Sequence, residues 1–159
     1  MKTAAFVGFS NTGKTTLLES LTAELKRRGR RVAVVKRCPH GFDFSPEGKD
    51  AARYLAAGAD CTLVLGPDRT ALLRREEALP DPQAAAASYF PDADFVLIEG
   101  GKNLDAPLKI EIVDPADPSR RVLSDDEVSA LVSEREIDSA RPVFRPGEVE
   151  RLADFLEAL

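Results

Sequence analysis

Five short runs of apolar residues recur along the chain, and most of them contain Val or Ile. The runs are Ala4–Phe9, Val32–Val35, Cys61–Leu65, Phe95–Ile98 and Leu108–Val113. Each run is continuous rather than alternating with polar residues, which is typical of strands that are buried on both faces of a parallel sheet. The pattern therefore predicts five buried strands in a mostly parallel sheet.

Helical patterns lie between and after these runs. In the first of them, Leu17, Leu18, Leu21 and Leu25 recur at helical spacing, and a basic end followed by Gly29 suits a helix C-terminus. We predict helices over Lys14–Arg28, Lys49–Ala57, Pro82–Phe90, Asp125–Val132 and Pro146–Leu159. The alternation of strands and helices indicates an α/β domain of three layers, with a mostly parallel central sheet flanked by helices. Its 159 residues suit a single domain over residues 1–159.

The segment Gly8–Thr15 matches the pattern G-x-x-x-x-G-K-[ST], or Walker A motif, in full, and it joins the first predicted strand to an amphipathic helix. This context predicts a P-loop NTPase domain in which loop N–H groups and the helix N-terminus bind phosphate. Lys14 would reach the β- and γ-phosphates, and the Thr15 hydroxyl would coordinate Mg²⁺. The predicted nucleotide-binding residues of the loop are Gly8, Ser10, Asn11, Thr12, Gly13, Lys14, Thr15 and Thr16. The loop carries no additional lysine near its start, so the variant loop of partitioning ATPases does not fit.

A second acidic element follows the apolar run at Phe95–Ile98, where Glu99 is succeeded by Gly100 and Gly101. We expect Glu99 to lie near the Mg²⁺ ion or to orient the attacking water, and Gly100 to leave its N–H free for the γ-phosphate. The opposing interpretation is a strand followed by a turn, with Glu99 merely solvated.

Charge changes the picture of possible partners. The formal net charge is −5, from 22 basic and 27 acidic residues, and this argues against general binding to nucleic acid or to a membrane surface. Residues 1–53 nevertheless carry a local charge of +6, which suits one small anion. Two cysteines form no disulfide framework, and the N-terminus shows no signal peptide, so we expect a cytoplasmic protein.

The stretch from Lys36 to Asp50 holds motifs that are more specific than the phosphate loop. A basic segment ends at His40, Phe42 and Asp43 follow, and Gly48-Lys49-Asp50 opens a helix that ends Ala57-Gly58-Ala59. Later come Glu99-Gly100-Gly101-Lys102, Lys109-Ile110-Glu111-Ile112 and Pro142-Val143-Phe144. With these motifs the chain resembles the molybdopterin-guanine dinucleotide biosynthesis protein B (MobB) family over nearly its whole length.

The resemblance implies a GTP-binding protein of molybdenum cofactor biosynthesis with weak GTPase activity and a homodimeric state. It implies assistance to the guanylyltransferase that attaches GMP to molybdopterin, and possible contact with molybdopterin itself. Guanine preference comes from the resemblance alone, because no Asn-Lys-x-Asp motif is present. Asp43 is our candidate for a switch-like carboxylate near Mg²⁺ or the hydrolytic water, against an alternative role as a turn former.

This chain departs from the family pattern where the family has Lys-His-x-His-His, since the corresponding segment reads Lys36-Arg37-Cys38-Pro39-His40. A Cys-Pro-His triplet also occurs in urease accessory GTPases, and thiolate and imidazole are good ligands for zinc or nickel. A metallochaperone that uses Cys38 and His40 across a dimer is therefore the alternative function. The plainer interpretation is that Cys38 is a packed loop residue.

Overall fold

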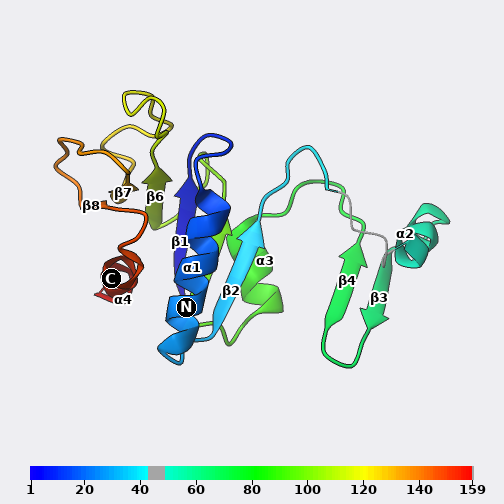
Figure 1. Ribbon diagram of the computed structural model, residues 1–159. Helices are drawn as coiled ribbons and strands as arrows, with labels where there is room; N and C mark the ends of the chain where they lie inside the picture. Colours follow the sequence, from blue (N-terminus) through cyan, green and yellow to red (C-terminus); the bar gives the residue numbers. More distant parts are fainter. Residues whose placement is uncertain (43–48, 159) are drawn as a thin grey trace. The chain divides into compact units, whose positions relative to one another are not determined.

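The computed structural model describes residues 1–42 and 49–158. The chain divides into two compact units: Met1–Arg37 together with Asp81–Leu159, and Cys38–Pro80 (Figure 1). The first unit contains α1 (Lys14–Arg27), α3 (Pro82–Tyr89) and α4 (Val149–Ala158), and the strands β1 (Lys2–Val7), β2 (Val32–Lys36), β5 (Phe95–Glu99), β6 (Leu108–Ile112), β7 (Ala130–Val132) and β8 (Val143–Phe144).

The six strands of the first unit form one sheet in the order β2-β5-β1-β6-β7-β8, and every neighbouring pair is parallel. Because the strands are parallel, their carboxyl ends meet at the same edge of the sheet. The loops that follow β1, β5 and β6 are therefore neighbours at this edge, and β1 lies between β5 and β6.

Successive residues of β1 point to opposite faces of the sheet and divide the core in two. Ala4 and Phe6 pack with leucines of α1 and α4 on one face. Ala5 packs on the other face with Val96, Ile98 and Ala86 of α3. Helices thus cover both faces of the sheet, and the continuous apolar runs of β1 and β5 are explained by burial on both sides.

Ion pairs tie the C-terminal end of α1 to α4. Arg28 lies 2.6 Å from Glu24, 2.6 Å from Asp154 and 2.7 Å from Glu157, and Arg30 lies 2.7 Å from Glu157. The basic cluster that ends the first helix is thus paired with acidic residues of the same unit. These contacts stabilise the packing of α4 on α1.

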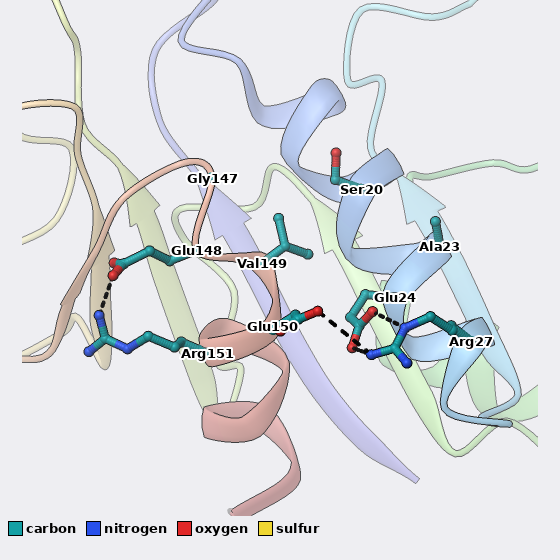
Figure 2. A pocket seen from close by; sticks show the side chains of 9 residues that line it. All are labelled: Ser20, Ala23, Glu24, Arg27, Gly147, Glu148, Val149, Glu150 and Arg151. Atoms are coloured by element: carbon teal, nitrogen blue, oxygen red, sulfur yellow. Dashed lines mark hydrogen bonds and ion pairs between the residues drawn. The ribbon is translucent and has the colours of Figure 1, made fainter.

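An open hollow of about 630 Å³ lies between α1 and α4 (Figure 2). Inside it, Glu24 accepts a 2.7 Å hydrogen bond from Nε of Arg27. Side-chain hydrogen bonds from Arg27 and then from Arg28 lower the pKa of Glu24 to about 2. Glu148 and Arg151 form a second ion pair on the α4 side. The charges that line this hollow pair with one another, which gives them a structural role.

The second unit contains α2 (Lys49–Ala56) and a hairpin of β3 (Cys61–Leu65) and β4 (Thr70–Arg74). The prediction that Cys61–Leu65 is a buried strand of the parallel sheet was wrong, because β3 pairs with β4 in an antiparallel sheet of two strands. Cys61 is exposed, and so are the side chains of Leu63, Val64 and Leu65.

Elsewhere the expected elements are confirmed within one or two residues at most ends, with one exception. The predicted helix over Asp125–Val132 was wrong: its last three residues form β7, and they are at most 1% exposed because β7 lies between β6 and β8. The hydroxyl of Ser124 donates a 2.6 Å hydrogen bond to Glu127 and closes a turn where the helix was expected. Strands β4 and β8 were not predicted. In the described part of the chain, every helix is too short or too polar to cross a membrane.

Candidate phosphate-binding site

The loop between β1 and α1 packs closely against the end of β6. A Cβ atom at Gly8 would lie 2.5 Å from the backbone oxygen of Ile112, so only glycine fits there. Asn11 and Gly13 both have φ angles in the left-handed region, 63° and 86°. The hydroxyl of Thr12 donates to the backbone oxygen of Phe9 at 3.0 Å. The sequence pattern therefore forms a tight, internally bonded loop.

Lys14 lies folded along this loop. Its Nζ donates to the backbone oxygens of Gly8 at 3.1 Å and Phe9 at 2.5 Å. Burial lowers the pKa of Lys14 from its usual value, Glu99 opposes that shift, and Lys36 adds to it. The amine is thus held at the start of the loop with a carboxylate close enough to influence it.

Thr15 and Glu99 meet at the carboxyl edge of the sheet. The Thr15 hydroxyl donates a 3.0 Å hydrogen bond to Oε1 of Glu99. Lys36, the last residue of β2, pairs in register with Glu99 and places its Nζ 3.4 Å from the same oxygen. The side chain of Glu99 is only 13% exposed and is in contact with both partners. The interpretation of Glu99 as a merely solvated residue was wrong.

These groups surround a cavity of about 520 Å³ in the first unit. It is lined by Ser10, Asn11, Gly13, Lys14, Thr15, Thr16, Lys36 and Glu99. The N-terminus of α1 opens onto it without a side-chain cap, whereas α3 is capped by Asp81. An uncapped helix N-terminus beside two lysines suits an anion with several oxygens, such as a phosphate chain.

The structure brings most of the predicted site residues together, with one correction and one omission. Gly100 was expected to leave its N–H free for a phosphate, and this was wrong: the N–H donates to the backbone oxygen of Phe6 at 2.9 Å. This bond belongs to the pairing of β5 with β1, whose register ends at Phe6 and Glu99, and the pairing uses the donor. Asp43 lies outside the described residues. Lys36 was given no role from the sequence, and its register with Glu99 brings it to the site.

Cys38 and His40 belong to the second unit, where the N–H of Gly41 donates to the backbone oxygen of Cys38 in a turn. Among the residues that the structure describes, there is no group of three or more His, Cys, Asp or Glu residues that could hold a metal ion. Within residues 1–42 and 49–158, no contact of Cys38 or His40 favours the metallochaperone alternative.

The glycine-rich loop joins a central strand of a parallel sheet to an uncapped helix. The carboxylate at the end of a neighbouring strand accepts a hydrogen bond from the threonine of this loop. This arrangement defines a P-loop nucleotide-binding protein. The family model described as molybdopterin guanine dinucleotide synthesis protein B, MobB, matches residues 3–134. The chain belongs to the MobB family, and the predicted α/β fold with a mostly parallel central sheet is confirmed.

Similar proteins carry the same family name. A molybdopterin-guanine dinucleotide biosynthesis adapter protein of Escherichia coli is 33% identical over 157 residues, which cover 96% of this chain and 89% of that protein. The adapter protein of Haemophilus influenzae is 29% identical, over 94% of this chain and 84% of that protein. A crystal structure of molybdopterin-guanine biosynthesis protein B superposes with a TM-score of 0.77 at 28% identity, over 98% of both chains. A MobB homologue from Bacillus stearothermophilus gives 0.72 at 26% identity, over all of both chains.

Proposed function

We propose that this protein binds GTP together with Mg²⁺ and acts as an adapter in the synthesis of molybdopterin guanine dinucleotide, where it assists the enzyme that attaches GMP to molybdopterin. The observation that carries the nucleotide part is the 3.0 Å contact between Thr15 and Glu99, beside Lys14 at the uncapped end of α1. Membership of the MobB family and the names of its relatives support the adapter role.

The residues at the site fit a magnesium ion. Mg²⁺ prefers oxygen ligands and is commonly held by one or two protein groups together with phosphate oxygens and water. The Thr15 hydroxyl and the Glu99 carboxylate supply two such oxygens from neighbouring elements. A bound Mg²⁺ would offset negative charge on the β- and γ-phosphates. Lys14 would hold the same phosphates through its amine, and Glu99 would also be placed to orient a water molecule.

Slow hydrolysis of GTP is part of the proposal, and the adapter role does not require fast turnover. Among the residues that the structure describes, Glu99 is the proposed carboxylate for orienting the attacking water. Asp43 remains a candidate from the sequence alone. Molybdopterin and the guanylyltransferase are the proposed partners.

A homodimer is the proposed assembly, and the hairpin of the second unit supports it. Among the described residues β3 and β4 pair only with each other, so each has an open edge. Leu65 is 73% exposed and Leu63 55% exposed on this hairpin. The hairpin packs against α2, yet these leucines stay exposed, so a second copy of the chain that covers them would stabilise it.

The proposal is tested by calorimetric titration of the full chain with GTP and with ATP, each with and without Mg²⁺. We expect GTP to bind more tightly than ATP and Mg²⁺ to strengthen binding. Lys14→Ala should lose most of the affinity, whereas Lys26→Ala, which removes an exposed lysine from the last turn of the same helix, should not. Binding that is absent, or that is unchanged in Lys14→Ala, would refute the nucleotide part.

The adapter part is tested separately with the purified guanylyltransferase. We expect the wild-type protein to bind this enzyme and to raise the yield of molybdopterin guanine dinucleotide from molybdopterin and GTP. Lys14→Ala should be a weaker stimulator if nucleotide binding matters to the adapter. A guanylyltransferase that neither binds the protein nor responds to it would refute this part and leave nucleotide binding standing.

A further inference from the structure

An arginine from the loop after β6 is seated on the phosphate loop itself. The guanidinium carbon of Arg120 lies 4.0 Å from the centroid of the Phe9 ring. Phe9 is the second residue of the phosphate loop, and its ring is half-buried. Nothing in the residue pattern of the loop points to Arg120, which lies more than 100 positions further along the chain.

The loop that carries Arg120 is held at its base by a buried carboxylate. Glu111, in β6, is 1% exposed and accepts hydrogen bonds from Nε of Arg121 at 2.8 Å and from the N–H of Val122 at 2.5 Å. The N–H of Arg120 donates to the backbone oxygen of Asp117 at 3.1 Å. The backbone next to Arg120 is therefore fixed from both sides, while its own side chain is exposed.

The guanidinium of Arg120 keeps its hydrogen-bond donors available. The guanidinium stacks on Phe9 and interacts electrostatically with Asp117. Within the described part of the chain, its side-chain nitrogens donate no hydrogen bond. A guanidinium that stacks on an aromatic ring is bound more weakly than a guanidinium that contacts a phosphate, because the phosphate accepts two charge-assisted hydrogen bonds at once.

The position of Lys14 shows which end of a nucleotide Arg120 would meet. Nζ of Lys14 lies on the backbone oxygen of Phe9, and in a loop of this pattern that amine serves the β- and γ-phosphates. The terminal phosphate therefore belongs at the Phe9 end of the loop. The loop has no additional lysine near its start, and Arg120 supplies a cation at that place.

We propose that Arg120 binds the terminal phosphate of the bound nucleoside triphosphate. The inference rests on the proposed nucleotide-binding function and adds a residue that distinguishes a triphosphate from a diphosphate. In the diphosphate complex Arg120 has no phosphate to reach and stays on the Phe9 ring. In the triphosphate complex the guanidinium turns from the ring to the phosphate oxygens, while the backbone held by Glu111 stays in place.

The test compares the affinities of two nucleotides, GDP and the non-hydrolysable β,γ-imido analogue of GTP, both with Mg²⁺. Arg120→Ala should weaken binding of the triphosphate analogue about tenfold, since hydrogen bonds to charged groups contribute at least that much, and should leave GDP affinity within about twofold. Arg120→Lys should retain part of the difference, because it keeps the charge but not the fork.

Arg31→Ala is the matched control. Arg31 is 61% exposed and precedes β2, so it lies at the opposite edge of the parallel sheet from the phosphate loop. Its removal changes the net charge by the same amount and should alter neither affinity. Phe9→Leu tests the other role that Arg120 could have, that of holding the loop through the ring. Because Arg120 leaves the ring in the triphosphate complex, this variant should weaken binding of the triphosphate analogue no more than binding of GDP.

Equal loss of both nucleotides in Arg120→Ala, or no loss of either, would overturn this inference alone and leave the proposed function standing. A wild-type protein that binds neither nucleotide would overturn both. The variant should fold like the wild type because the side chain is exposed, and circular dichroism checks this before the titrations.

Discussion

Glu111 is a buried carboxylate whose removal tests how the loop after β6 is held. It is 1% exposed and bonds Nε of Arg121 at 2.8 Å, the N–H of Val122 at 2.5 Å and the N–H of Leu123 at 3.3 Å. The side chain of Arg121 is itself only 19% exposed. Glu111→Ala would leave a guanidinium and two backbone donors without their acceptor.

The expected loss of unfolding free energy follows from this geometry. Breaking a buried ion pair by removing one partner costs about 3–5 kcal/mol, because the remaining charge stays in a poorly solvated place. Arg121 keeps one further partner, Asp125 at 3.4 Å, which is 81% exposed and offsets little of this cost. We therefore expect Glu111→Ala to lose about 3 kcal/mol or more, a large share of the stability of an ordinary domain.

Urea denaturation followed by circular dichroism measures the effect, since the chain contains no Trp for fluorescence. Glu150→Ala is the control, because Glu150 is 77% exposed and 3.8 Å from its partner Arg27, and its loss should cost less than about 1 kcal/mol. A loss below about 1 kcal/mol for Glu111→Ala would refute the reasoning.

A double variant separates the two contributions of Glu111. Replacing Glu111 by Leu and Arg121 by Met removes the unpaired charge, and such replacements of buried pairs are often neutral. The N–H groups of Val122 and Leu123 would still lack their acceptor, at about 1–3 kcal/mol each. We expect partial recovery over Glu111→Ala, and a fully wild-type stability would show that these two donors contribute nothing.

Three further outcomes are expected. Leu65→Lys should shift the molar mass from light scattering from that of a dimer toward 17.3 kDa with an unchanged circular dichroism spectrum, and a dimer that persists would remove the hairpin from the interface. Hydrogen bonds from Arg27 and from the arginine after it lower the pKa of Glu24 to about 2 from an ordinary 4.5, so the stabilisation it gives is present above pH 4.5 and is lost as the pH falls toward 2. Denaturation midpoints between pH 7 and pH 2 should therefore fall less steeply in Glu24→Gln than in the wild type, and identical slopes would contradict this. Gly8→Ala should abolish nucleotide binding in the calorimeter, because its Cβ would lie 2.5 Å from the oxygen of Ile112, and undiminished affinity would show that the loop tolerates the shift.

The site was the part most open to prediction from the sequence. The phosphate loop is a continuous segment, and its glycines, lysine and threonine are set by local backbone geometry and by the chemistry of phosphate. Glu99 could be placed beside it because a carboxylate at the end of a buried parallel strand reaches the same sheet edge. The register of β2 with β5, which brings Lys36 to Glu99, depends on pairing between distant segments.

Predictions from local sequence patterns were wrong where contacts with distant segments determine whether a residue is buried. Cys61–Leu65 has the apolar run of a buried strand but lies on an exposed hairpin, and an apolar run by itself does not say what covers it. Asp125–Val132 has helical composition, yet Ala130–Val132 enters the sheet because β6 and β8 supply its hydrogen bonds and bury it. The N–H of Gly100, expected to be free, is used for a similar reason, because the pairing of β5 with β1 takes it as a donor to Phe6.

The sequence by itself determined the α/β class, the phosphate loop and the strand-end carboxylate, because each depends on the periodicity or chemistry of one short segment. Only the tertiary structure decided the order of the strands, the seating of Arg120 on Phe9 and the fixing of its loop by Glu111. These contacts join residues that lie far apart along the chain. Their energies arise from packing and desolvation between segments, and the residue pattern of a single segment does not reveal them.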